Sequence, residues 1–202
     1  MVLDSCRRIA SCNRLMEVRL LSNDSTAAGW LTPTGDPPDT DESLERKLSQ
    51  WVKALSGLPD GMVRPRWTPV QPAQPAQSVN WCGFGILSIT GDDNPAFVNQ
   101  SDDSTEMWKH EQIECMTSFY GPGSQGVASQ FRDGLKVSQN NAQLNTLGLS
   151  LGEYSKLVSA PELINQQWVR RYDMTIFLRR KLIRTYGIKS VLGTNFTITT
   201  GD

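Results

Sequence analysis

Apolar residues first recur with helical spacing after residue 40. They fall at i, i+4, i+7, i+8 and i+11, which predicts one apolar stripe along a helix of about 3.6 residues per turn. The residues of this stripe are Leu44, Leu48, Trp51, Val52 and Leu55. Asp39 or Thr40 is expected to cap the first free amides, and Gly57 with Pro59 ends the pattern. The segment is therefore predicted to be an amphipathic helix.

The pattern changes to a period of two residues after a proline-rich passage. From Val79 to Ile89 both alternating sets of positions carry apolar residues, which is typical of a strand covered on both faces. A second alternating run spans residues 106–120, and the polar loop 91–105 lies between the two runs. Together they predict a long hairpin with an acidic tip.

A second helix is predicted from Ser124 onward. Its apolar residues lie four apart, and two later leucines extend the pattern after a break at residues 140–141. These residues are Val127, Phe131, Leu135, Leu144 and Leu147. The helix is expected to pack on the hairpin.

The longest β pattern spans residues 166–186. One parity is apolar and consists of Trp168, Tyr172, Met174, Ile176, Leu178 and Leu182. Gly187 predicts a turn, and residues 188–199 predict a last strand. The elements together indicate an α+β fold in which an antiparallel or mixed sheet with long hairpins is packed by about two helices.

Residues 1–39 differ from the rest of the chain. A possible short helix from Cys6 to Leu21 is followed by a run rich in turn-forming residues up to Pro38. We therefore expect an N-terminal arm over residues 1–39 and a folded domain over residues 40–202.

Charge and hydropathy exclude some partners. The 20 Lys and Arg residues balance 21 Asp and Glu residues, and the net charge of -1 gives no overall attraction to nucleic acid or to an anionic membrane. No apolar stretch approaches the roughly 20 residues of a membrane-spanning helix, and the first 30 residues are too charged for a signal peptide. The chain is expected to stay in a cytoplasm-like compartment with no membrane partner.

The four cysteines indicate neither a disulfide framework nor a zinc site. Cys6, Cys12, Cys82 and Cys115 contain no pair with the two-residue gap of a zinc knuckle. Reduced thiols are expected, with no metal.

A glycine motif at residues 121–126 formally satisfies G-x-G-x-x-G between a predicted strand and a predicted helix. The preceding strand alternates with polar residues, and residue 141 is Asn where a dinucleotide site has an acid. We interpret the motif as a sharp turn at Gly121 and Gly123, with Ser124 as the helix cap. No cofactor is predicted.

The remaining candidates for chemistry are weak. The acidic loop carries Asp92, Asp93, Asp102 and Asp103, but it lacks the ligand order of a calcium-binding loop. His110 is the only histidine, and neither a zinc-protease motif nor a nucleophile elbow accompanies it. The sequence thus predicts a protein that is not an enzyme and has no catalytic residues.

Basic residues cluster near the C-terminus. The series comprises Arg170, Arg171, Arg179, Arg180, Lys181, Arg184 and Lys189. Strand alternation sends Arg171, Arg179 and Lys181 to one face and Arg170, Arg180 and Arg184 to the other. Two hypotheses remain open: these cations line a channel for DNA, or they pair with the acidic loop of a neighbouring subunit. Phe177 and Ile183 are expected at or near a subunit contact because they make the second parity partly apolar.

The order of these segments resembles a family of bacteriophage neck or tail-terminator proteins. The matching stretches are residues 50–59, residues 120–123 leading into the second helix, and residues 168–174 through Gly187 and Ile188. The resemblance covers roughly residues 41–202. The 40 N-terminal residues and the long acidic loop depart from the compact pattern and suggest an added contact with another neck component.

The resemblance implies a structural virion protein that forms a ring, usually a hexamer, at the head-proximal end of the tail tube. The partners it implies are further copies of the chain, the tail-tube protein and the head–tail connector, with transient non-specific contact to genomic DNA. The expected location is the virion tail or neck, and the host cytoplasm during assembly. The alternatives are another tube or head–tail adaptor subunit, and a nucleic-acid-binding protein that uses the basic C-terminal segment.

Overall fold

The computed structural model describes residues 23–70, 72–164 and 166–189. Within this part the helices are α1 (Asp41–Ser56), α2 (Ser124–Gly134) and α3 (Ser138–Thr146). The strands are β1 (Val63–Pro65), β2 (Trp81–Gly91), β3 (Ala96–Val98), β4 (Thr105–Tyr120), β5 (Leu149–Tyr154), β6 (Val158–Ser159), β7 (Glu162–Ile164), β8 (Gln167–Val169) and β9 (Arg171–Tyr186). The predicted α+β class is confirmed.

The main sheet has the strand order β1-β2-β4-β9-β5, with β3 added to β4 and β6 added to β9. β1 lies parallel to β2, whereas β2, β4, β9 and β5 pair antiparallel in succession. The predicted hairpin is confirmed, because β2 pairs with β4 from Trp81 opposite Tyr120 to Gly91 opposite Glu111. β7 and β8 form a separate small hairpin.

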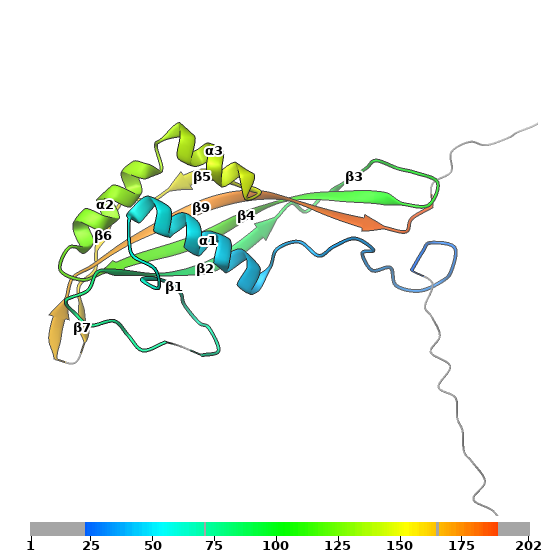
Figure 1. Cartoon of the computed structure of the whole chain (residues 1–202). Helices are drawn as coiled ribbons and strands as arrows, with labels where there is room; N and C mark the ends of the chain where they lie inside the picture. The colour runs from blue at the N-terminus through cyan, green and yellow to red at the C-terminus, as the bar shows by residue number, and fades with distance from the viewer. Residues whose placement is uncertain (1–22, 71, 165, 190–202) are drawn as a thin grey trace, which may run out of the picture.

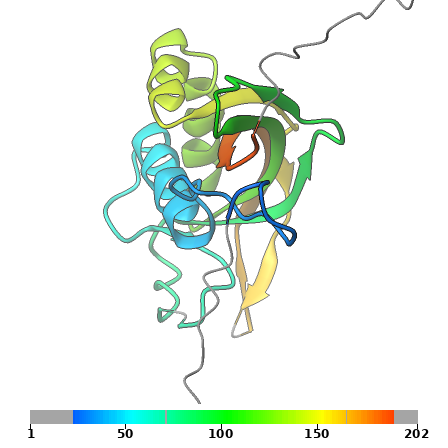
Figure 2. The same cartoon turned by 90° about the vertical axis from the view of Figure 1, so that its right-hand side faces the viewer.

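All three helices lie on one face of the sheet (Figures 1 and 2). The odd-numbered residues of β4 and the even-numbered residues of β9 point toward them, and most of both sets are apolar along the covered part. The most deeply buried of them are Ile113, Cys115, Phe119, Met174, Ile176 and Leu178. The opposite side of the sheet, formed by even-numbered residues of β4 and odd-numbered residues of β9, is called the open face below.

Helix α1 buries the whole apolar stripe that the sequence predicts. Thr40 precedes the helix and its N–H donates to Ser43 Oγ at 3.0 Å. Gly57 ends the helix in the left-handed region at φ 69°, where its N–H donates to the Lys53 carbonyl at 3.0 Å. Trp51 then packs edge-on against Phe131 of α2, with 5.6 Å between ring centroids.

The second helical region divides earlier than expected. α2 ends at Gly134, and Asn140 and Asn141 lie inside α3 instead of at the break. Their side-chain amides donate to the carbonyls of Gly134 (2.9 Å) and Leu135 (3.1 Å). The two asparagines therefore donate hydrogen bonds to carbonyl groups that have no helical partner at the end of α2. This explains why they fall just after the break.

The long strands β4 and β9 extend beyond the helices as a projecting arm (Figure 1). The arm consists of Thr105–Lys109, Lys181–Tyr186 and β3, which pairs with Glu106–Trp108. The predicted loop 91–105 thus contains a short strand. Residues 23–36 run beside the arm, where Thr34 N–H donates to the Thr185 carbonyl at 2.8 Å.

The predicted strand 166–186 is two strands. β8 ends at Val169 and pairs with β7 after a turn at Gln166, whose φ of 63° few strand residues adopt. Trp168 consequently leaves the main sheet and is 73% exposed. From Met174 to Leu182 the predicted apolar parity is buried. The expected helix over residues 6–21, and residues 190–199 of the expected last strand, lie outside the described residues.

Cys82 and Cys115 are buried on the helix-covered side of the sheet and are free thiols. Burial raises the pKa of both thiols, that of Cys115 to about 12. Neither thiol ionises near neutral pH, so both act as small apolar core residues.

Candidate functional site

Strand β9 distributes its cations between the two faces of the sheet. The register places Arg171, Arg179 and Lys181 on the open face, opposite Tyr120, Gln112 and His110 of β4. Arg180 and Arg184 point to the other side. Arg170 lies between β8 and β9, where its guanidinium donates to the Pro122 carbonyl at 3.2 Å. Lys189 follows β9 beside Ser25.

Arg180 is buried and fully engaged in the fold. Its side chain is 7% exposed and donates to one oxygen of Glu111 through Nε (3.0 Å) and Nη2 (2.8 Å). Nη1 donates to the Asp39 carbonyl at 2.5 Å. Arg180 therefore fastens the start of α1 to the sheet and is not available to DNA or to a neighbouring subunit.

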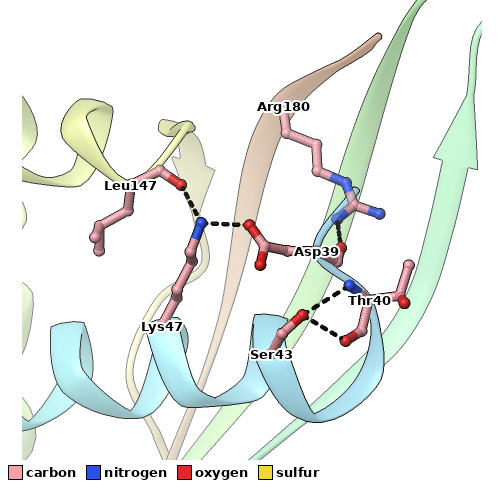
Figure 3. Close-up of polar contacts among 6 residues, drawn as sticks. All are labelled: Asp39, Thr40, Ser43, Lys47, Leu147 and Arg180. Carbon is pink, nitrogen blue, oxygen red and sulfur yellow. Dashed lines mark hydrogen bonds and ion pairs between the residues drawn. The ribbon is translucent and has the colours of Figure 1, made fainter. Parts of the chain in front are cut away.

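Asp39 links the same region to α3 (Figure 3). Its carboxylate accepts from Lys47 Nζ, which also donates to the Leu147 carbonyl at 3.3 Å. The hydrogen bond from Lys47 lowers the pKa of Asp39 below its usual value. Asp39, the last residue of the predicted N-terminal arm, is thus in contact with the helical layer.

Arg171 is held by acids and by an aromatic stack. Nε donates to Asp173 at 2.8 Å and Nη1 to Glu162 at 3.1 Å, while the guanidinium lies 5.4 Å from the centroid of the Tyr120 ring. Burial alone would lower the pKa of Arg171, but the bonds to these acids outweigh it and raise the pKa. Arg171 therefore stabilises this end of the sheet.

Trp81 completes that stack on the other side of Tyr120. The two rings lie 4.3 Å apart and within 7° of parallel. Arg66 donates to the Tyr120 hydroxyl at 3.0 Å, and burial raises the pKa of that phenol. The segment after β1 thus covers the end of the open face, a contact that the sequence pattern did not predict.

Arg179 and Lys181 are the exposed cations of the open face. Lys181 Nζ lies 3.6 Å from the centroid of the Trp108 ring, and no ion pair of the described chain involves either residue. The same face carries carboxylates by register, namely Glu106, Glu114, Glu153 and Asp173. Its charge is therefore mixed instead of strongly basic.

The two apolar contact candidates lie apart on this face. Phe177 is half-buried in the middle of the sheet, opposite Glu114 and Glu153. Ile183 is 41% exposed on the arm, opposite Trp108.

The acidic residues occupy the two turns that flank β3. Asp92 and Asp93 precede it, Asp102 and Asp103 follow it, and all four are exposed. Asp92 accepts from the His110 backbone at 3.1 Å, and Ser101 donates to Asp103 at 3.1 Å. In the described residues no salt bridge involves these carboxylates, and no cluster of side chains is suited to a metal ion.

The glycine motif is a packed turn. Gly121 has φ 111°, and a Cβ there would lie 2.6 Å from the Val79 carbonyl oxygen. Gly123 is the residue before α2, and its N–H donates to Asn80 at 2.8 Å. The expected cap by Ser124 is wrong: Ser124 is the first residue of α2, and its buried hydroxyl has no partner among the described residues. The turn is fixed by Asn80 instead.

The described residues form a sheet with helices on one face only, a projecting arm and exposed apolar residues, which are features of a subunit that contacts other chains. The family comparison agrees with this class. Residues 42–202 match the family of the phage neck terminator protein, and the chain belongs to this family. A search of curated proteins found no match. In the described part of the chain, no helix has the length and apolar character needed to cross a membrane.

Proposed function

We propose that the chain forms a ring that ends the phage tail tube and joins it to the head–tail connector. Membership of the neck terminator family makes the protein a structural component of the phage neck. The observation that supports a ring is the asymmetry of the sheet: within the described residues, the three helices all occupy one face (Figure 2) and leave the other face without a helix. A hexamer is the proposed stoichiometry. The proposed partners are the tail-tube protein and the connector, and the proposed place of assembly is the host cytoplasm.

The open face is the proposed wall of the lumen through which DNA passes. Arg179 and Lys181 attract phosphates there, while the carboxylates on the same face limit that attraction. Genome transit requires this balance, because tight phosphate contacts would slow release. Weak, salt-sensitive and sequence-independent DNA binding is expected.

Sizing combined with negative-stain imaging tests the ring. Rings or tube caps support the proposal, and a chain that remains monomeric at all concentrations contradicts it. A monomer that retains DNA binding would favour the alternative of a nucleic-acid-binding protein.

The role of the cations is tested by replacing Arg179 and Lys181 together with Ser. Arg171 is kept, because its ion pairs belong to the fold. Lys136→Ser is the control, since Lys136 is exposed beside the helices. Rings that assemble but yield fewer infectious particles support the lumen. Rings that dissociate, and that are partly restored by Asp92→Lys or Asp102→Lys because the unpaired carboxylate is gone, support pairing with a neighbour's acidic loop. Normal assembly with normal infectivity would contradict both.

A further inference from the structure

Two strand edges of the main sheet have no partner among the described residues. β1 pairs only with Cys82–Phe84, so the outer side of β2 is uncovered from Ile86 to Gly91. Leu87 and Ile89 on this stretch are 46% and 47% exposed. At the opposite border of the sheet, no described strand pairs with the outer side of β5. Exposed apolar edges of this kind bind further strands readily.

The two edges lie level with each other across the sheet. The strand registers connect Ile89 through Ile113 and Leu178 to Leu151 in a single row. The next row connects Thr90 to Ser150 in the same way. The four-strand section β2-β4-β9-β5 therefore begins and ends at the same height.

Backbone groups point outward at both ends of the first row. Asp92 N–H donates to the His110 carbonyl at 3.0 Å, and by alternation Thr90 also bonds to β4 while Ile89 points away from it. On β9, the Thr175 carbonyl accepts from Ser155 at 2.8 Å, so the odd-numbered residues of β9 bond toward β5. Ser150 is thus bonded to its partner on β9, and Leu151 points outward.

The strand directions fit as well. β2 runs antiparallel to β4, β4 to β9, and β9 to β5, so β5 runs opposite to β2. When a second copy is placed beside the first in the same orientation, its β5 lies antiparallel to the first copy's β2. Each chain therefore carries both halves of one antiparallel contact.

We propose that β2 of one copy pairs with β5 of the next, so that the sheets join edge to edge. This inference rests on the proposed ring and names its contact. The two edges are different surfaces, and the contact is therefore head-to-tail, the type from which cyclic rings are built. The contact covers Leu87 and Ile89 and satisfies the outward backbone groups of Ile89 and Leu151.

Disulfide cross-linking tests the pairing directly. Cysteines are placed at Thr90 and Ser150, which would meet as a non-hydrogen-bonded pair, with Cα atoms about 4.5 Å apart. Because a closed sheet staggers its strands, a second variant carries cysteines at Ser88 and Ser150. Both are made in a Cys6→Ser, Cys12→Ser background. One of the two double variants is expected to give a ladder of dimers, trimers and larger species on oxidation, whereas the single-cysteine variants stay monomeric on the gel.

Replacing Ile89 with proline is a second test of the proposed strand pairing. Ile89→Pro removes an N–H that points outward and leaves the bonds to β4 in place. The free monomer should keep its melting temperature, while the dissociation constant of the ring rises at least about tenfold, which equals a loss of about 1.4 kcal/mol. Val137→Lys is the control, since Val137 is likewise 47% exposed but lies between α2 and α3.

The outcomes separate this inference from the proposed function. If the wild-type chain forms rings, but neither cysteine variant cross-links and Ile89→Pro does not weaken the ring, the edge pairing is wrong and the proposed ring is unaffected. Dimers formed by the Thr90→Cys single variant would show a back-to-back contact and also overturn it. A wild-type chain that forms no ring contradicts the proposed function itself.

Discussion

The guanidinium of Arg180 and the carboxylate of Glu111 face each other across neighbouring strands, with side chains only 7% and 10% exposed. Removing one partner of such a buried pair leaves an uncompensated charge. Glu111→Gln is expected to lower the free energy of unfolding by about 3 kcal/mol. Chemical denaturation measures the change.

The double variant Glu111→Leu, Arg180→Leu is the control for this pair. It removes both charges together, so it should be more stable than Glu111→Leu alone. A double variant no more stable than the single one would show that the pair is not the reason for the loss.

Acid should weaken the junction between α1 and α3. The pKa of Asp39 is lowered by Lys47, so the stability from this contact is present above the unfolded value of about 3.9 and is lost as the pH falls through the folded pKa. Lys47→Met removes the largest cause of the lowered pKa. The wild-type advantage over Lys47→Met, measured as melting temperature, should therefore shrink below about pH 4. A constant difference between pH 7 and pH 3 would contradict this assignment.

Two glycines of the same motif should respond in opposite ways to alanine. Gly121→Ala places a Cβ against the Val79 carbonyl at positive φ and should cost about 1–3 kcal/mol of stability. Gly126 lies inside α2 with open space around it, so Gly126→Ala should add about 0.5–1 kcal/mol. The melting temperatures of the two variants, compared with that of the wild type, test this prediction. Equal effects would mean that the turn is not constrained as described.

Aspartate at the two apolar positions of the open face should separate assembly from folding. Ile183 is exposed on the arm, so Ile183→Asp is expected to leave a folded monomer and to weaken any contact made there. Phe177 is half-buried beside Glu114 and Glu153, so Phe177→Asp should destabilise the fold as well. Circular dichroism and sizing are the measurements. Intact rings from both variants would exclude these residues from the contact.

The N-terminal arm is predicted to be dispensable for folding and to be ordered by a partner in the particle. In the described part of the N-terminal arm, Thr34 forms a backbone hydrogen bond with β9, and the Asp39 carbonyl accepts a hydrogen bond from Arg180. Deletion of residues 1–22 should leave the melting temperature unchanged, and deletion of residues 1–39 should lower it while the chain still folds. An insoluble, unfolded chain after the shorter deletion would assign those residues to the core.

The periodic segments could be predicted from the sequence because burial acts on one side of each element. The stripe of α1 and the parity of β9 from Met174 to Leu182 are confirmed, since each faces a single core. The break at Arg170 and the end of α2 were missed. The first depends on the pairing of β8 with β7, and the second on hydrogen bonds from Asn140 and Asn141, and periodicity encodes neither.

The candidate site was predictable only in part. Alternation placed Arg179 and Lys181 on one face, and Arg171 beside Asp173 on that same face, yet it gave no sign that Arg180 is buried against Glu111. Opposite charges find each other through strand register, and register is set by the assembled sheet. The same holds for the unpaired edge of β2, whose apolar residues looked like those of a covered strand.

The buried, un-ionised thiols of Cys82 and Cys115 also bear on the life cycle of a virion component. A virion component is exposed after release to dissolved oxygen, which attacks thiolates. Protonated sulfur enclosed by the core is a poor substrate for that attack. The two thiols of this core are therefore protected from oxidation in the released virion as long as the fold remains closed around them.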